Sequence, residues 1–171
     1  MLSNNPFLLL NVNCEEEFMG KSYEEIRNGA NIFATATKAL DAIGTAGLEQ
    51  MEQTESGKAL AQMMLPAIVL KAFSCELALK ALAAKNQEAV GSVHKLNELY
   101  QKINKDTQKE ISAAVIAVMK ETSPEYSDAD FTEDLNKVAK VFIDWRYYYE
   151  NSRSLNFAFL HSFFYAVLAC L

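Results

Sequence analysis

The stretch that decides the fold is "LPAIVLKAFSCELALKALAAK", Leu65–Lys85. Its apolar residues and good helix formers do not alternate as a strand requires, so the stretch predicts a long helix. Glu76 and Lys80 fall on the apolar stripe of that helix and form an i,i+4 pair in the favourable order. A carboxylate among apolar neighbours must be paired or protonated. Three polar residues fall on roughly the opposite side: Lys71, Ser74 and Lys85.

A second stretch, "VFIDWRYYYEN" at Val141–Asn151, offers a partner for that carboxylate. Arg146 borders an apolar seam, and Glu150 follows one helical turn later. If the two helices pack together, Arg146 reaches Glu76 as a bidentate fork flanked by aromatic rings. The seam itself follows heptad spacing: Leu135, Val138, Phe142, Trp145 and Tyr149.

The candidate polar cluster is therefore Glu76, Lys80, Arg146 and Glu150. It has two interpretations. In the first, a half-buried ion network fixes how two helices pack, and we favour this one because structural networks perturb charges as functional sites do. In the second, Arg146 and Lys80 face a shared cleft and hold a phosphate.

The two histidines are weaker candidates. His94, in "GSVHKLNELY", is expected in the first turn of a helix, where the helix dipole favours the neutral ring. His161 lies in an apolar helix and is expected to be a core residue or to line an interface. Either ring could instead meet Arg146 across a dimer interface.

Cysteine and histidine usage argues against a metal site, and we expect no cofactor. The three cysteines, Cys14, Cys75 and Cys170, are an odd number without paired spacing, which fits a reducing cytoplasm. With only two histidines, a multi-histidine metal site would have to be shared between chains. No nucleotide-binding glycine loop, nucleophile elbow or HExxH motif occurs.

Composition predicts one folded domain. The chain has 171 residues, half of them hydrophobic, and a net charge of −6. A protein that grips nucleic acid through its phosphates usually has a basic stripe. Here the lysines between Lys85 and Lys109 are interleaved with acidic residues, which indicates a solvated face of mixed charge.

The predicted fold is all-α, a bundle of five to six antiparallel helices over residues 21–171, preceded by an irregular arm at 1–20. The first expected helix runs from Tyr23 to Gly44 and Gly47, and the second from about Ser56 to Lys85 with a kink or restart at Pro66. The third is capped by Ser92 and ends near Lys102 to Asn104, and the fourth covers 107–121. The fifth runs from Asp130 or Thr132 through Glu150, and the last begins at about Leu155.

The last stretch, 155–171, is nearly all apolar. Crossing a bilayer takes about 20 such residues, and this run is near the lower limit with a histidine inside it. We expect a buried terminal helix and no membrane association. A C-terminal apolar anchor is the minority alternative.

Three segments together resemble the HEPN family (higher eukaryotes and prokaryotes nucleotide-binding domains). The pattern is Glu-x-x-x-Lys at Glu76 and Lys80, then His-x-Leu-x-x-Leu from His94, then the Trp-Arg-Tyr helix around Arg146. The resemblance covers about residues 60–150. It implies a helical bundle that dimerises and, in many members, a ribonuclease acting in toxin–antitoxin pairs or anti-phage defence.

The family's ribonuclease signature, an arginine followed a few residues later by a histidine, is missing. After Arg146 the histidine window holds Asn151 and Ser152, and Arg153 precedes His161 by too wide a spacing. RNA cleavage through a 2′-hydroxyl needs a general acid/base near neutrality and a cation for the phosphate. Arg146 could supply only the cation.

Three hypotheses remain. The first is a non-catalytic or degenerate HEPN-like module, a homodimer associated with RNA or nucleotide. The second is an active, metal-independent ribonuclease whose site is completed across the dimer. The third is a purely structural interaction protein in which Arg146 only stabilises the bundle.

Overall fold

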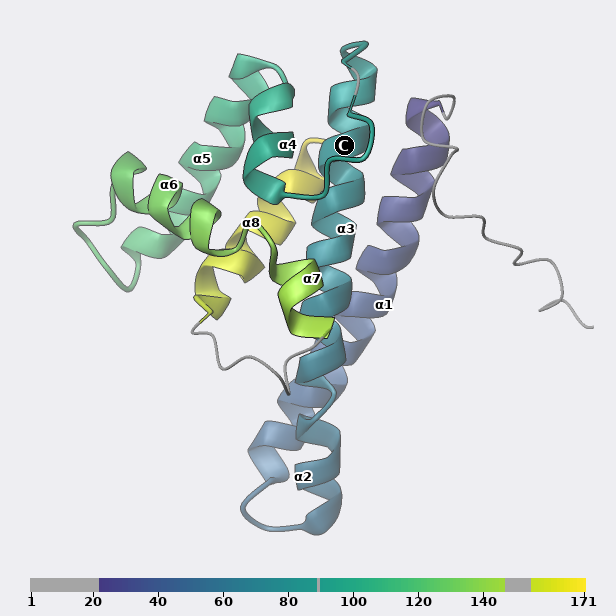
Figure 1. The fold of residues 1–171 in the computed structure, drawn as a ribbon. Coiled ribbons are helices and arrows are strands. Elements are labelled where there is room, and N and C mark those ends of the chain that lie inside the picture. Colours follow the sequence, from purple (N-terminus) through teal and green to yellow (C-terminus); the bar gives the residue numbers. More distant parts are fainter. Residues whose placement is uncertain (1–21, 89, 147–154) are drawn as a thin grey trace, which may run out of the picture.

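The computed structural model describes residues 22–88, 90–146 and 155–171 (Figure 1). The described residues form helices and no strand, and the all-α bundle is confirmed. Five helices have ten residues or more: α1 (Tyr23–Gln50), α3 (Met64–Lys85), α5 (Lys105–Lys120), α6 (Asp128–Lys137) and α8 (Phe157–Ala169). Three are shorter: α2 (Glu55–Ala61), α4 (Leu96–Lys102) and α7 (Val141–Arg146). The arm predicted at 1–20 lies outside the described residues.

Helix α3 is the centre of the bundle. Helix α1 lies beside it along most of its length, while α8, α7 and α4 pack on other sides, and α5 and α6 form an outer layer next to α8 (Figure 1). Consequently the side of α3 that carries Lys71 and Ser74 is also buried. The Ser74 hydroxyl donates a hydrogen bond of 2.9 Å to the Ala30 carbonyl oxygen of α1.

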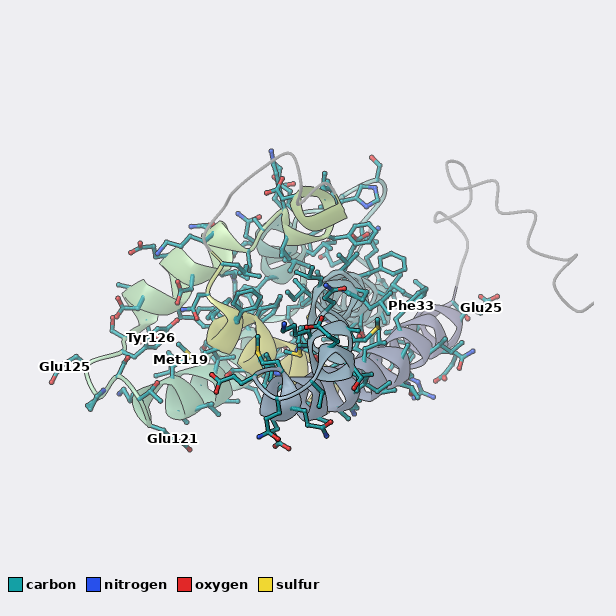
Figure 2. The ribbon with its side chains drawn as sticks, turned by 90° about the horizontal axis from the view of Figure 1, so that it is seen from below. Glu25, Phe33, Met119, Glu121, Glu125 and Tyr126 are labelled. Carbon is teal, nitrogen blue, oxygen red and sulfur yellow. The ribbon has the colours of Figure 1, made fainter. Side chains whose placement is uncertain are left out.

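Elsewhere, the helices divide their faces between core and solvent. Figure 2 shows Phe33 pointing from α1 toward the interior, whereas Glu25, at the start of the same helix, points outward. Glu121 and Glu125, in the connection between α5 and α6, also point away from the molecule (Figure 2). This division places Glu25, Glu121 and Glu125 in water and the Phe33 ring against Phe73 of α3.

The C-terminal stretch forms α8, whose core-facing side is buried as predicted, whereas Phe157, His161 and Tyr165 on its other side are exposed. Phe159 and Phe163 are fully enclosed, and their rings stack at 5.7 Å between centroids. Phe131 of α6 packs edge-on against Phe159 at 5.6 Å. Within the described part of the chain, no helix is long and apolar enough to cross a membrane.

The predicted end of the first helix at Gly44 and Gly47 is wrong, because α1 continues to Gln50. Both glycines are buried where α1 meets the next segment. A Cβ at Gly47 would lie 2.3 Å from the Ala61 amide nitrogen, and one at Gly44 would lie 2.5 Å from the Met64 sulfur. These glycines permit a close approach of two segments, a role that a helix-terminating glycine does not have.

The helix predicted from about Ser56 to Lys85 forms in two pieces, α2 and α3, separated by Gln62 and Met63. Pro66 lies in the first turn of α3. An amide there has no acceptor within the helix, so the missing N–H costs nothing. The predicted restart near Pro66 is confirmed.

The single helix predicted from Asp130 or Thr132 through Glu150 is wrong over its described part. Helix α6 already begins at Asp128, capped by Ser127, and it ends at Lys137. Helix α7 then starts at Val141. The break leaves the Ala139 carbonyl oxygen free to accept a hydrogen bond of 3.0 Å from the Leu96 amide of α4. The helix is therefore interrupted where α4 bonds to it, although Leu135 and Val138 of the predicted seam are buried.

The predicted helix start at Ser92 is also wrong. Helix α4 begins at Leu96, and its N-cap, Lys95, makes no side-chain capping bond. His94 therefore precedes the helix, in a loop that turns at Gly91 with a φ of +46°. That loop position frees the ring to point toward α3.

Candidate functional site

Glu76 and Lys80 form the buried ion pair that their spacing predicts. Lys80 Nζ lies 2.9 Å from Glu76 Oε1, one helical turn along α3. The Lys80 side chain is 1% exposed and the Glu76 side chain is 2% exposed. Removing either charge would destabilise the fold, because the other would remain buried without a compensating charge.

The same carboxylate oxygen binds His94. Its Nδ1 lies 2.8 Å from Glu76 Oε1, while half of the imidazole, 52%, stays exposed. Because the carboxylate can only accept, Nδ1 carries the proton. Glu76 Oε2 is buried and accepts no hydrogen bond from a described residue. The Glu76 carboxylate therefore links the buried Lys80 ammonium to a histidine at the protein surface.

Helix α7 packs against α3 beside this cluster. The rings of Phe73 in α3 and Phe142 in α7 stack at 4.7 Å between centroids. Arg146 is the last residue of α7, but its side chain lies outside what the structure describes, as does all of Glu150. The predicted contact between Arg146 and Glu76 therefore stays a prediction, whereas Glu76, Lys80 and His94 are brought together.

This geometry leaves Nε2 of His94 available as a hydrogen-bond or proton acceptor. With Nδ1–H held by a buried carboxylate, the neutral ring has its free lone pair on Nε2. A half-exposed ring oriented in this way can accept a hydrogen bond or a proton from a bound molecule. Lys80 stabilises the negative charge of Glu76 and so keeps the orienting group in place.

A second polar cluster lies on another side of α3, and sequence reasoning missed most of it. Lys71 Nζ lies 2.8 Å from Asp41 Oδ2 of α1 and 3.1 Å from His161 Nδ1 of α8. Lys71 is 7% exposed and Asp41 is 16% exposed. His161 was a weak candidate from sequence; it is exposed and joins this cluster and not the one around Glu76.

The environment of His161 disfavours its charged form. Burial lowers the pKa of the ring, and the nearby Lys71 ammonium lowers it further, while Asp41 acts in the opposite direction. The ring is therefore neutral near pH 7. Since Nδ1 faces an ammonium donor, the proton lies on Nε2.

A cavity of about 370 Å³ opens beside this second cluster. It is lined by residues of α1, α3, α5 and α8, among them Asp41, Lys71 and His161. Its remaining lining is mostly apolar: Met64, Ile68, Val118, Phe157, Ala158, Leu160 and Ser162. The sequence signal for it was Lys71, a charged residue in the first half of the largely apolar helix α3.

Metal ligands do not gather anywhere in the described ranges: no group of three or more histidine, cysteine or acidic side chains there could hold an ion. Cys75 is buried in α3, and burial raises the pKa of its thiol well above the usual range.

Comparison with protein-family models, with curated proteins and with solved structures finds no match for the chain.

Proposed function

We propose that the chain is an HEPN-like helical module that associates with RNA or nucleotide through the surface around His94, without turning it over. The supporting observation is the imidazole of His94, held by buried Glu76 and half open to solvent. The resemblance of the segments around Glu76, His94 and Arg146 to the HEPN pattern motivates the choice of ligand. A homodimer in the cytoplasm, in a toxin–antitoxin or anti-phage system, belongs to the same proposal.

The charge of the chain limits the form of that ligand. At a net charge of −6, an extended phosphate backbone would be repelled over most of the surface. A nucleotide or a short single-stranded end needs only one local contact. We therefore expect binding of mononucleotides or RNA ends in preference to duplexes.

Binding can be measured by fluorescence polarisation with labelled ATP and with a labelled single-stranded oligoribonucleotide. His94→Ala should weaken binding at least tenfold, or about 1.4 kcal/mol. Lys109→Ala, on the exposed face of α5, is the matched control and should leave binding unchanged. If the folded wild type binds neither probe, the structural-protein hypothesis replaces the proposal.

The second candidate is a metal-independent ribonuclease with a site completed across a dimer. Its support is the lone pair on Nε2 of His94, which supplies the general base that the sequence motif lacks. The test is cleavage of labelled RNA in EDTA, with sedimentation to determine the oligomer. Cleavage by the wild type that is abolished in His94→Gln, at an unchanged melting temperature, would favour this candidate over simple binding.

A further inference from the structure

The side of α1 that faces away from α3 carries no charge over most of its length. At about 3.6 residues per turn, this side is a sector of about 120°, opposite to the buried Ala30, Ala34 and Thr37. Ile32, at 59% exposed, and Ile43, at 41% exposed, lie in the sector. Its exposed residues, which we call the α1 outer face, are Asn28, Ile32, Thr35, Ala36, Ala39, Ala42, Ile43, Ala46 and Gln50.

The charged residues in this part of α1 point elsewhere. The Asp41 carboxylate meets Lys71 of α3 at 2.8 Å, and the Lys38 ammonium lies 5.6 Å from the centroid of the Tyr165 ring of α8. By the same helical spacing, Glu49 lies at one edge of the outer face. The solvated side of a helix normally carries charged residues, whereas an exposed apolar patch marks an interaction surface. Figure 1 shows α1 at an edge of the described bundle, with α3 on its inner side, so a partner can approach the outer face.

The apolar residues of the α1 outer face are arranged symmetrically along the helix. The turn from Ala36 to Ala39 has Ile32 four residues before it and Ile43 four residues after it. Two copies of α1 that pack antiparallel about this turn place Ile32 of each copy against the partner's Ile43. The small alanines at the centre let the two helix axes approach to about 8 Å, the close end of helix packing distances. The face is therefore complementary to itself, as an interface around a two-fold axis requires.

The charges at the ends of the face favour the antiparallel arrangement. Arg27 binds Glu24 at 2.6 Å near the start of α1, whereas Glu49 lies near its end. Antiparallel packing about the 36–39 turn brings the partner's Arg27 nearly level with Glu49, and a guanidinium has enough donors to join two carboxylates. Parallel packing would instead bring Glu49 against the partner's Glu49, and Arg27 against the partner's Arg27. Antiparallel copies also place opposite ends of the helix dipoles together.

We propose that the α1 outer face docks a second copy of this chain, which packs antiparallel on it about a two-fold axis at the 36–39 turn. The inference rests on the homodimer included in the proposed function and names its surface. The face is about 33 Å long and about 10 Å wide, which is small beside the about 800 Å² per partner that a standard interface buries. The dimer should therefore form reversibly and at high protein concentration.

Sedimentation equilibrium of the full chain, without RNA or nucleotide, tests this surface. The wild type should dimerise as its concentration rises. Ala39→Glu should weaken dimerisation at least tenfold, because two carboxylates would meet at the centre of the interface. Ala113→Glu, on the exposed side of α5, is the matched control and should dimerise as the wild type does. A dimer that Ala39→Glu leaves intact would overturn the inference.

A wild type that stays monomeric would also overturn it. If Ala39→Glu then lowers the melting temperature of the monomer, another part of the same chain covers the face and not a second copy. Binding of labelled ATP by the same samples tests the His94 surface separately, so the two proposals can fail independently.

Cysteine cross-linking tests the register. When Ile32→Cys and Ile43→Cys chains are mixed and oxidised, they should form a disulfide between the two variants, since antiparallel packing brings these positions level. Either variant alone should cross-link no more than the wild type, whose own cysteines give the background. Cross-linking of each variant to itself would show parallel packing and contradict the proposed axis.

Discussion

The buried ion pair of α3, Glu76 and Lys80, is expected to contribute strongly to the stability of the bundle. Lys80→Met should destabilise the chain by about 3–5 kcal/mol, because Glu76 would remain in the core with only a half-exposed histidine as a described partner. Urea unfolding measures the loss. Lys58→Met, which breaks an exposed i,i+3 pair with Glu55, is the control and should leave the midpoint unchanged.

A double variant distinguishes the ion pair from its parts. Glu76→Leu with Lys80→Met removes both charges and should cost much less than the sum of the two single changes. Additive losses would show that the two side chains act independently of each other, against the geometry of the pair.

His161 gives the chain a pH dependence of defined sign. Its pKa in the folded state is lowered by burial and by Lys71, so the unfolded chain binds a proton more readily. Stability from this group is complete above the ordinary pKa of about 6.5 and is lost as pH falls below it. The urea midpoint of the wild type should fall more than that of His161→Gln between pH 7.5 and 5.5. Parallel curves would contradict this assignment.

Sequence spacing was sufficient for Glu76 and Lys80, since an i,i+4 pair is formed within one helix. It was insufficient for Asp41 and Lys71, which meet only because α1 lies beside α3. His94 shows the same limit: its contact with Glu76 depends on a loop that the sequence predicted as helix. Contacts between helices depend on how the helices pack, and sequence periodicity does not predict that packing.

At the scale of the elements, glycines determine how closely the α1–α2–α3 segment packs. Gly47→Ala should destabilise the chain by about 1–3 kcal/mol, because its Cβ would overlap the backbone of α2. Gly29→Ala is the matched control in the same helix. Its Cβ would meet Leu77 at 3.6 Å, an ordinary contact, so it should stabilise by about 0.5–1 kcal/mol. Thermal unfolding distinguishes the two signs, and equal effects would contradict the close approach.

Helix boundaries were predicted correctly where the local sequence determines them, and wrongly where contacts with other helices are involved. Pro66 marks the restart of α3 by its own covalent chemistry. At the break between α6 and α7, by contrast, the Ala139 carbonyl oxygen is bonded to the Leu96 amide, a partner that local rules do not supply. Glycine has two structural uses, and its position in the sequence does not reveal which applies.

Over the whole molecule, α8 closes the bundle against α3 and α5. Tyr23, at the start of α1, donates a hydrogen bond to the carbonyl oxygen of Leu171. Asp134 of α6 accepts from Asn156, the N-cap of α8, at 2.7 Å and from Tyr126 at 3.0 Å. These bonds join α8 to α1 and α6, so we expect the bundle to unfold as one cooperative unit.

The core of α8 provides a test at that scale. Phe163→Ala should cost about 3–5 kcal/mol, because the ring is fully enclosed and its removal leaves a cavity. Tyr165→Ala, on the exposed side of the same helix, should cost at most about 1 kcal/mol. Unfolding should follow the same transition by circular dichroism and by tryptophan fluorescence. Two separate transitions would show that α8 folds independently.

The three glycines where α1 turns back toward α3 have a consequence for how this architecture can change over time. At Gly44, Gly47 and Gly57 an added methyl group would come within 3 Å of a neighbouring segment. At Gly44 the obstructing atoms belong to the flexible Met64 side chain, whereas at Gly47 and Gly57 they are backbone atoms, so these two positions must stay without a side chain. Diverged relatives of this chain should therefore keep glycine at these positions even where the rest of the sequence is no longer similar.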